Sequence, residues 1–146
     1  MTYIGIDPGK DGAMTILREG AEPEIVHFSV GYLKYLRMLS GAKSICYLEQ
    51  VHSMPRDSHK TAFSFGENYG WIRGILEALH IPYQTVPPQT WKKEFSLSSD
   101  KAKSIECAKR LFPNVSLFRT DKCKTEHDGM AESLLIAEYG RRKYGR

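Results

Sequence analysis

The sequence contains 146 residues, of which 41% are hydrophobic and 26% are charged; this length and composition exclude a disordered or fibrous chain and suit one globular domain. The net charge of +4 is unevenly distributed: residues 92–146 carry 13 Lys and Arg against 8 Asp and Glu, whereas residues 1–91 carry 8 against 9. The basic C-terminal third favours a polyanionic partner, with a well-solvated surface as the alternative.

The hydrophobic pattern of residues 1–79 predicts hairpin strands first and helices later. Residues Tyr3–Asp7 form a short apolar run that ends at the turn residues Pro8–Gly12, which is typical of a buried strand. In chain order, we expect strands at Tyr3–Asp7, Ala13–Leu17 and Glu24–Val30, a helix at Tyr32–Leu39, a strand at Ser44–Gln50, a polar loop over residues 51–60 and a helix at Ala62–Leu79.

Residues 80–146 predict one more strand and two more helices. The strand Pro82–Val86 is expected to stop at the following Pro-Pro pair. A basic helix at Lys101–Leu111, a polar connection over residues 113–125 and a helix at Asp128–Tyr139 complete the chain. Because hairpin strands come first and then alternate with helices, we predict a mixed sheet with helices on both faces, as one α/β domain spanning residues 1–146.

Several classes of protein are disfavoured by what the chain lacks. No apolar run approaches the roughly 18 residues of a membrane span, and no basic region precedes a long apolar stretch at the N-terminus, so we expect neither a membrane contact nor a signal peptide. The cysteines Cys46, Cys107 and Cys123 form no Cys-x-x-Cys pair, which argues against a disulfide framework or a zinc ribbon. We therefore expect a cytoplasmic protein with reduced thiols.

Two acidic residues end predicted strands. Asp7 follows Ile-Gly-Ile, and Glu49 follows Ile-Cys-Tyr-Leu. A carboxylate inside a buried run must be paired or must bind a metal, and neighbouring strands lie about 4.8 Å apart, so the two acids can converge on the same ions. The alternatives are that Asp7 caps the turn that follows it and that Glu49 lies at a solvated strand edge.

A second acidic pair lies at the start of the last predicted helix. Asp128 and Glu132 are four residues apart, which places them on one helix face, where their repulsion calls for a compensating cation. The alternative is an N-terminal cap by Asp128 and a solvated Glu132. Four oxygen ligands suit Mg²⁺ or Mn²⁺ rather than zinc. Two such ions about 3.5–4 Å apart would activate water and stabilise the leaving oxygen of a phosphodiester.

Three motifs together resemble the RuvC family of Holliday-junction resolvases, within the RNase H-like superfamily. They are Ile-Gly-Ile-Asp-Pro-Gly at residues 4–9, Tyr-Leu-Glu at residues 47–49 and His-Asp-Gly-Met-Ala-Glu-Ser-Leu-Leu at residues 127–135. The Phe- and Gly-rich stretch of residues 63–74 is similar to phage-encoded RuvC relatives. Sugar kinases and actin-like proteins share the first motif, but this chain is too short for their two duplicated domains.

The resemblance implies a five-stranded RNase H-like sheet, a carboxylate cluster that holds two Mg²⁺ ions, and a homodimer that nicks two strands symmetrically. Asp7 and Glu49 match the family's acids directly. The family has two acids, or a His and an Asp, three residues apart in the last helix, whereas Asp128 and Glu132 are four apart. Asp128 is the firmer candidate of this pair, and His127 is held in reserve, with a partly exposed helix-start histidine as its alternative.

Two lysines and one glycine-spaced helix also have a role if the chain resembles RuvC. Lys92 and Lys103 match the basic residues that RuvC relatives keep near the active site, where a lysine can hold the scissile phosphate; the alternative is a solvated surface. The helix Ala62–Leu79 has Gly66, Gly70 and Gly74 at four-residue spacing. We expect it to form the dimer contact, with packing inside one chain as the alternative.

The function predicted from these residues is that of a Mg²⁺-dependent endonuclease that binds and nicks branched DNA and resolves four-way junctions. Two alternatives stay open: a broader nuclease that also cuts flaps and forks, and a catalytically silent DNA-binding scaffold. Recombination, repair and the debranching of phage DNA are all consistent with such an activity.

Overall fold

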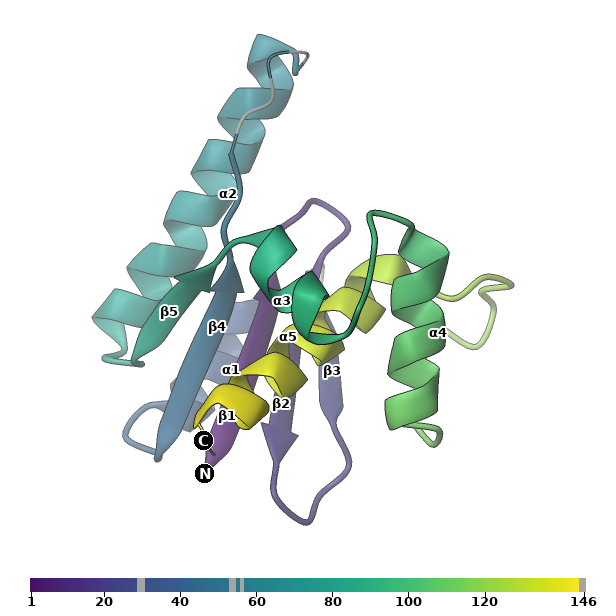
Figure 1. The fold of residues 1–146 in the computed structure, drawn as a ribbon. Helices are drawn as coiled ribbons and strands as arrows, with labels where there is room; N and C mark the ends of the chain where they lie inside the picture. Colours follow the sequence, from purple (N-terminus) through teal and green to yellow (C-terminus); the bar gives the residue numbers. More distant parts are fainter. Residues whose placement is uncertain (29–30, 53–54, 56, 145–146) are drawn as a thin grey trace.

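A five-stranded mixed sheet forms the centre of the molecule, seen in a computed structural model that describes residues 1–28, 31–52, 55 and 57–144 (Figure 1). Its strands are β1 (Thr2–Asp7), β2 (Ala13–Arg18), β3 (Glu24–His27), β4 (Ser44–Glu49) and β5 (Tyr83–Val86), in the order β3-β2-β1-β4-β5. β2 is antiparallel to both β1 and β3, whereas β1, β4 and β5 run parallel. This sheet confirms the predicted fold class.

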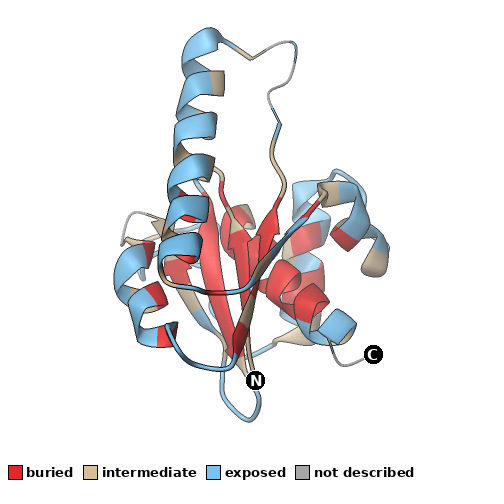
Figure 2. Ribbon diagram, turned by 90° about the vertical axis from the view of Figure 1, so that its left-hand side faces the viewer, coloured by how far each residue is buried: buried red, intermediate tan, exposed pale blue. Residues whose placement is uncertain are grey.

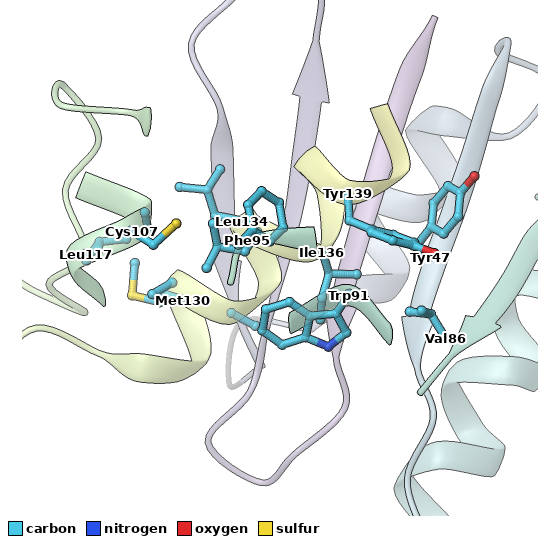
Figure 3. Close-up of a cluster of buried hydrophobic side chains, with 14 residues drawn as sticks. Tyr47, Val86, Trp91, Phe95, Cys107, Leu117, Met130, Leu134, Ile136 and Tyr139 are labelled. Carbon is cyan, nitrogen blue, oxygen red and sulfur yellow. The ribbon is translucent and has the colours of Figure 1, made fainter. Parts of the chain in front are cut away.

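Helices cover both faces of the sheet. α1 (Tyr32–Leu39) and α2 (His59–Ala78) lie on one face, and α3 (Pro88–Glu94), α4 (Lys101–Leu111) and α5 (Asp128–Tyr144) lie on the other (Figure 1). Alternate residues of the central strands supply the two cores, because successive side chains of a strand point to opposite faces. Ile4 and Ile6 pack with α1 and α2, whereas Tyr47 packs in the cluster of α3, α4 and α5 (Figure 3). No described helix is both long and apolar enough to cross a membrane.

Helix α5 lies directly on β1 because Gly5 has no side chain. A Cβ at Gly5 would overlap the backbone nitrogen of Ala137 and the carbonyl oxygen of Ser133. The hydroxyls of Ser133 and Thr15 share a buried hydrogen bond of 2.8 Å, which ties α5 to β2 as well. This close contact sets the distance between the first turns of α5 and the end of β1.

Three helices and strands differ from expectation by more than one residue at an end. Helix α2 begins at His59 rather than Ala62, because the Ser58 hydroxyl caps it by accepting a hydrogen bond from the Thr61 N–H. Its N-terminal half projects beyond the sheet and is mostly exposed (Figure 2). Helix α5 continues to Tyr144. Strand β3 ends at His27; the last two residues of the expected strand, 29 and 30, lie outside the described residues.

Among the helices and strands of the described residues, α3 is the one that the sequence pattern missed. Pro88 was expected to stop the chain after β5, but it occupies the first position of α3. A proline fits there because the first N–H groups of a helix have no partner within the helix and the ring's backbone angle is already helical. The short helix buries Trp91 completely against the sheet, and it brings Lys92 beside Glu132 of α5.

Candidate active site

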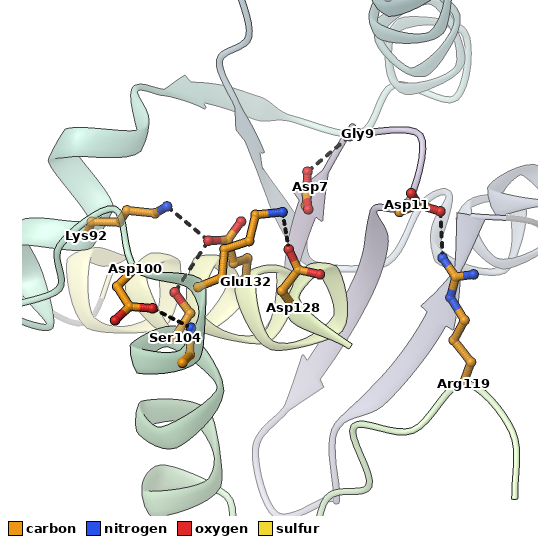
Figure 4. A network of polar contacts seen from close by, with 11 residues as sticks. Asp7, Gly9, Asp11, Lys92, Asp100, Ser104, Arg119, Asp128 and Glu132 are labelled. Carbon is orange, nitrogen blue, oxygen red and sulfur yellow. Dashed lines mark hydrogen bonds and ion pairs between the residues drawn. The ribbon is translucent and has the colours of Figure 1, made fainter. Parts of the chain in front are cut away.

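The four predicted acids line one pocket at the carboxyl ends of β1 and β4. Asp7 and Glu49 are the last residues of two adjacent parallel strands, and their positions in the alternation place both on the α5 face. Asp128 and Glu132 belong to the first two turns of α5. The pocket has a volume of about 570 Å³, and its charged or titratable lining consists of Asp7, Lys10, Asp11, Glu49, Lys101, Arg119, His127, Asp128 and Glu132 (Figure 4).

Asp7 is half-buried and accepts a 3.0 Å hydrogen bond on Oδ1 from the Gly9 N–H (Figure 4). Asp7 therefore caps the turn that follows β1, which was the alternative to a metal-binding role, and it also lines the pocket. Burial raises the pKa of Asp7 to about 7, and the nearby carboxylates of Glu49, Glu132 and Asp128 act in the same direction. Burial is the larger cause of the raised pKa, and the neighbouring carboxylates add to it.

Glu49 is buried, and one of its oxygens has a partner inside the protein. The Trp91 indole Nε1–H donates a 2.9 Å hydrogen bond to Glu49 Oε1. Burial raises the pKa of Glu49, and the hydrogen bond from Trp91 offsets part of that rise. Glu49 is thus not the solvated edge residue that the alternative described.

Two lysines hold the acids of α5 (Figure 4). Lys92 Nζ lies 2.9 Å from Glu132 Oε1, which also accepts a 3.4 Å hydrogen bond from the Ser104 hydroxyl. Lys101 forms an ion pair with Asp128. Burial acts against the charge of Asp128, but the hydrogen bond and the charge of Lys101 outweigh it, so the pKa of Asp128 is lowered. These lysines are the cations that the repulsion between the two acids calls for.

The two lysines predicted from the sequence lie in different surroundings in the structure. Lys92 contacts Glu132, whereas Lys103 is exposed on α4 and makes no ion pair with the described residues. Lys101, two residues earlier, lines the pocket instead. Lys101 is the first residue of α4, after the N-cap Asp100, and this helix end faces the start of α5. The role of Lys103 stays a prediction.

Two further polar residues lie at the pocket: Arg119, which had no signal in the sequence, and His127, which the sequence analysis held in reserve. Arg119 Nη2 lies 2.8 Å from Asp11 Oδ1, which joins the connection between α4 and α5 to the turn after β1. His127 lines the pocket, and its ring meets that of His27 edge-to-face at 5.3 Å. Burial, with the charge of Arg119, lowers the pKa of His127 and favours its neutral form.

The donor set fits a hard divalent cation. All four acids offer carboxylate oxygens, and no thiolate lines the pocket. Burial and the neighbouring carboxylates both raise the pKa of Asp7, and a bound cation would favour its charged form against both. As the side chains stand, no three His, Cys, Asp or Glu residues of the described chain gather closely enough to hold an ion, and Lys92 and Lys101 occupy two of the acids. Binding a metal therefore requires these side chains to shift.

Two solved structures resemble this chain over nearly its whole length. Thermus thermophilus RuvC covers 99% of this chain and 97% of its own, with a TM-score of 0.63 and 15% sequence identity. T. thermophilus RuvC in complex with a Holliday junction substrate covers 98% of this chain and 96% of its own, with a TM-score of 0.63 and 16% identity. Comparison of the sequence with protein-family models and with curated proteins finds no match. The chain has a RuvC-like fold.

Proposed function

We propose that this protein is a metal-dependent endonuclease that binds branched DNA and resolves four-way junctions by paired symmetric nicks. The observation that carries the proposal is the pocket in which acids from β1, β4 and α5 meet basic side chains from α3, α4 and the connection before α5. The RuvC-like fold supports it, since one similar structure is a complex with a Holliday junction substrate. We expect the activity in the cytoplasm, where the substrate DNA would be found.

In this proposal Asp7, Glu49, Asp128 and Glu132 would hold two Mg²⁺ or Mn²⁺ ions, which when bound supply an activated water and charge stabilisation for a leaving oxygen. The chain's own cations then act on the DNA. Lys92 and Lys101 exchange their carboxylate partners for the backbone phosphate of the bound strand. Arg119 lies at the same pocket and offers a bidentate guanidinium, a geometry that suits phosphate.

The test compares labelled four-way junctions, flaps and plain duplexes of matched sequence, each with Mg²⁺ or with EDTA. We expect two symmetric nicks in the junction with Mg²⁺ and binding without cleavage in EDTA. Equal cleavage of flaps and junctions would favour the broader branch nuclease instead. Junction binding with no cleavage in any divalent metal would identify a DNA-binding scaffold.

The lysines allow a direct comparison on one helix. We expect Lys101→Gln to slow junction cleavage by at least tenfold, because it removes a cation that lines the pocket and pairs with Asp128. Lys103→Gln should slow cleavage less, because Lys103 does not line the pocket. Removing a lysine that contacts phosphate should also lower the salt slope of binding, by about 0.9 on B-DNA. Single-turnover rates and binding at several salt concentrations measure both effects. A larger loss in Lys103→Gln would return the catalytic role to Lys103.

We propose that the active form is a homodimer joined through α2. An added Cβ at Gly66, Gly70 or Gly74 meets no described atom within 4 Å, so the glycine face is open in the single chain. Phe63 lies at the projecting end of the same helix and is 73% exposed. A two-fold dimer would supply the two matched sites that a junction with approximate two-fold symmetry needs.

The dimer is tested with Gly70→Leu. Leucine favours a helix over glycine by roughly 1 kcal/mol, so we expect the fold to be kept, while the larger side chain prevents close helix approach. Sedimentation at micromolar concentration should show a dimer for the natural chain and a monomer for the variant, which then makes single, unpaired nicks. A natural chain that is monomeric with and without junction DNA, yet still makes paired nicks, would rule out this dimer.

A further inference from the structure

Trp91 contributes a single polar atom to an otherwise apolar environment. Its side chain is fully buried and packs in the cluster that includes Val86, Phe95 and Ile136 (Figure 3). A buried indole N–H needs an acceptor, and any backbone carbonyl would satisfy it. Here the acceptor is the Glu49 carboxylate, at 2.9 Å. The hydrogen bond therefore connects the hydrophobic core to one of the four acids of the pocket.

This contact leaves the two oxygens of Glu49 unequal. Oε1 accepts the indole N–H, whereas no described residue donates a hydrogen bond to Oε2. The carboxylate belongs to the last residue of β4, which the sheet holds firmly. With its backbone set by the strand and one oxygen set by Trp91, the Glu49 side chain has little remaining freedom.

Helix α3, which contains Trp91, is held against α5 by an ion pair and a cation–π contact. Lys143 Nζ lies 3.0 Å from Glu94 Oε2, and the Arg142 guanidinium lies over the Phe95 ring at 4.8 Å. The next residue after Trp91 is Lys92, which pairs with Glu132. Helix α3 thus contacts two of the four acids, one on β4 and one on α5. The contacts of Glu94 and Phe95 hold its C-terminal end in place.

We propose that Trp91 is a positioning residue of the metal site: its indole N–H orients the Glu49 carboxylate so that Oε2 stays available to a divalent cation. The inference rests on the proposed metal-dependent function. Partners of this kind, which hold a metal ligand without touching the metal, typically change metal affinity about 10–100-fold when they are removed. A tryptophan buried only for packing would have no such effect.

The first test is Trp91→Phe, which keeps an aromatic ring in the core and removes the N–H. We expect calorimetry with Mn²⁺, in the absence of DNA, to show metal binding weakened by about tenfold or more. The matched control is Trp71→Phe, at the only other tryptophan of the chain, which is 44% exposed on α2; its Mn²⁺ affinity should equal that of the natural protein. An affinity of Trp91→Phe within twofold of the natural value would overturn the proposal.

A second measurement avoids any change at Trp91. In Trp71→Phe, Trp91 is the only tryptophan, so its fluorescence reports on its own surroundings. Because Mn²⁺ is paramagnetic and would bind within a few atoms of the indole, we expect saturable quenching that follows the calorimetric Kd. Adding Glu49→Gln to this background should abolish the quenching. Emission that stays constant through metal saturation would contradict the proposed contact, even if Trp91→Phe fails to fold.

These measurements separate the inference from the proposed function. If the natural protein cleaves no branched DNA while Trp91→Phe still weakens Mn²⁺ binding, the endonuclease proposal fails and the positioning role stands. If the natural protein resolves junctions while Trp91→Phe binds Mn²⁺ normally, the positioning role fails and the function stands.

Discussion

Asp7→Asn should abolish DNA cleavage and at the same time make the metal-free protein more stable at pH 8. The loss of activity follows from the proposed role of Asp7 as a metal ligand, because an amide carries no charge to offer a divalent cation. We expect cleavage to fall by at least a thousandfold while junction binding in EDTA changes little, since Asp7 is not a phosphate contact. A loss of binding as large as the loss of cleavage would show that Asp7 is structural.

The gain in stability follows from the sign of the pKa shift. Burial and the neighbouring carboxylates raise the pKa of Asp7 from an ordinary value of 3.8 to about 7. Between these values the unfolded chain loses the proton that the folded chain keeps, so the free energy of unfolding falls as pH rises from about 4 to 7 and stays low above. Asn removes this penalty, and we expect a gain of about 1–3 kcal/mol at pH 8 and almost none at pH 4.

Urea unfolding in EDTA at pH 4 and pH 8 measures the difference. Asp11→Asn is the matched control at the same pocket, because the hydrogen bond from Arg119 lowers the pKa of Asp11. Its charged form favours the folded state above the ordinary pKa, so Asp11→Asn should lose stability at pH 8 rather than gain it. Equal behaviour of the two variants would contradict the raised pKa of Asp7 in the folded protein.

Gly5→Ala should destabilise the fold strongly. The new methyl would overlap the backbone of α5 at Ser133 and Ala137, and backbone atoms cannot move aside as the end of a flexible side chain can. Helix α5 must then lift from β1, which opens the core and displaces Asp128 and Glu132 from the pocket. We expect a loss of at least ~3 kcal/mol, a large part of the 5–15 kcal/mol that stabilises a typical domain.

Thermal and urea unfolding of Gly5→Ala measure this loss against Thr2→Ala. Thr2 begins the same strand and is only half-buried, so its replacement should cost no more than about 1 kcal/mol. Equal losses in the two variants would contradict the close contact between β1 and α5.

Local pattern was enough to predict most of the fold and the candidate acids. The strand ending at Asp7 and the strand ending at Glu49 are short apolar runs bounded by a charge, and their length and their β-branched and aromatic residues favour strands. The spacing of Asp128 and Glu132 likewise follows from the helix repeat alone. These features depend on neighbours in the chain, which is why a single sequence reveals them.

Helix α3 depends on tertiary structure instead. Seven residues are too few to form a stable helix alone. Its stability comes from burying Trp91 and from the contacts of Glu94 and Phe95 with the end of α5. A local sequence pattern does not reveal these distant contacts, so it predicts only that the Pro-Pro pair ends strand β5.

By itself, the sequence determined the order of all the strands and helices except α3, the place of Asp7 and Glu49 at strand ends, the shared helix face of Asp128 and Glu132, and the basic character of the C-terminal third. Only the tertiary structure decided which polar groups meet those acids. The Trp91–Glu49 and Arg119–Asp11 contacts join residues 42 and 108 positions apart, and Lys101 reaches Asp128 because α4 packs against α5. These pairings depend on how the helices pack on the sheet, including the close contact between α5 and β1 that Gly5 permits. The distances between packed helices and strands depend on the whole fold, and no single segment determines them.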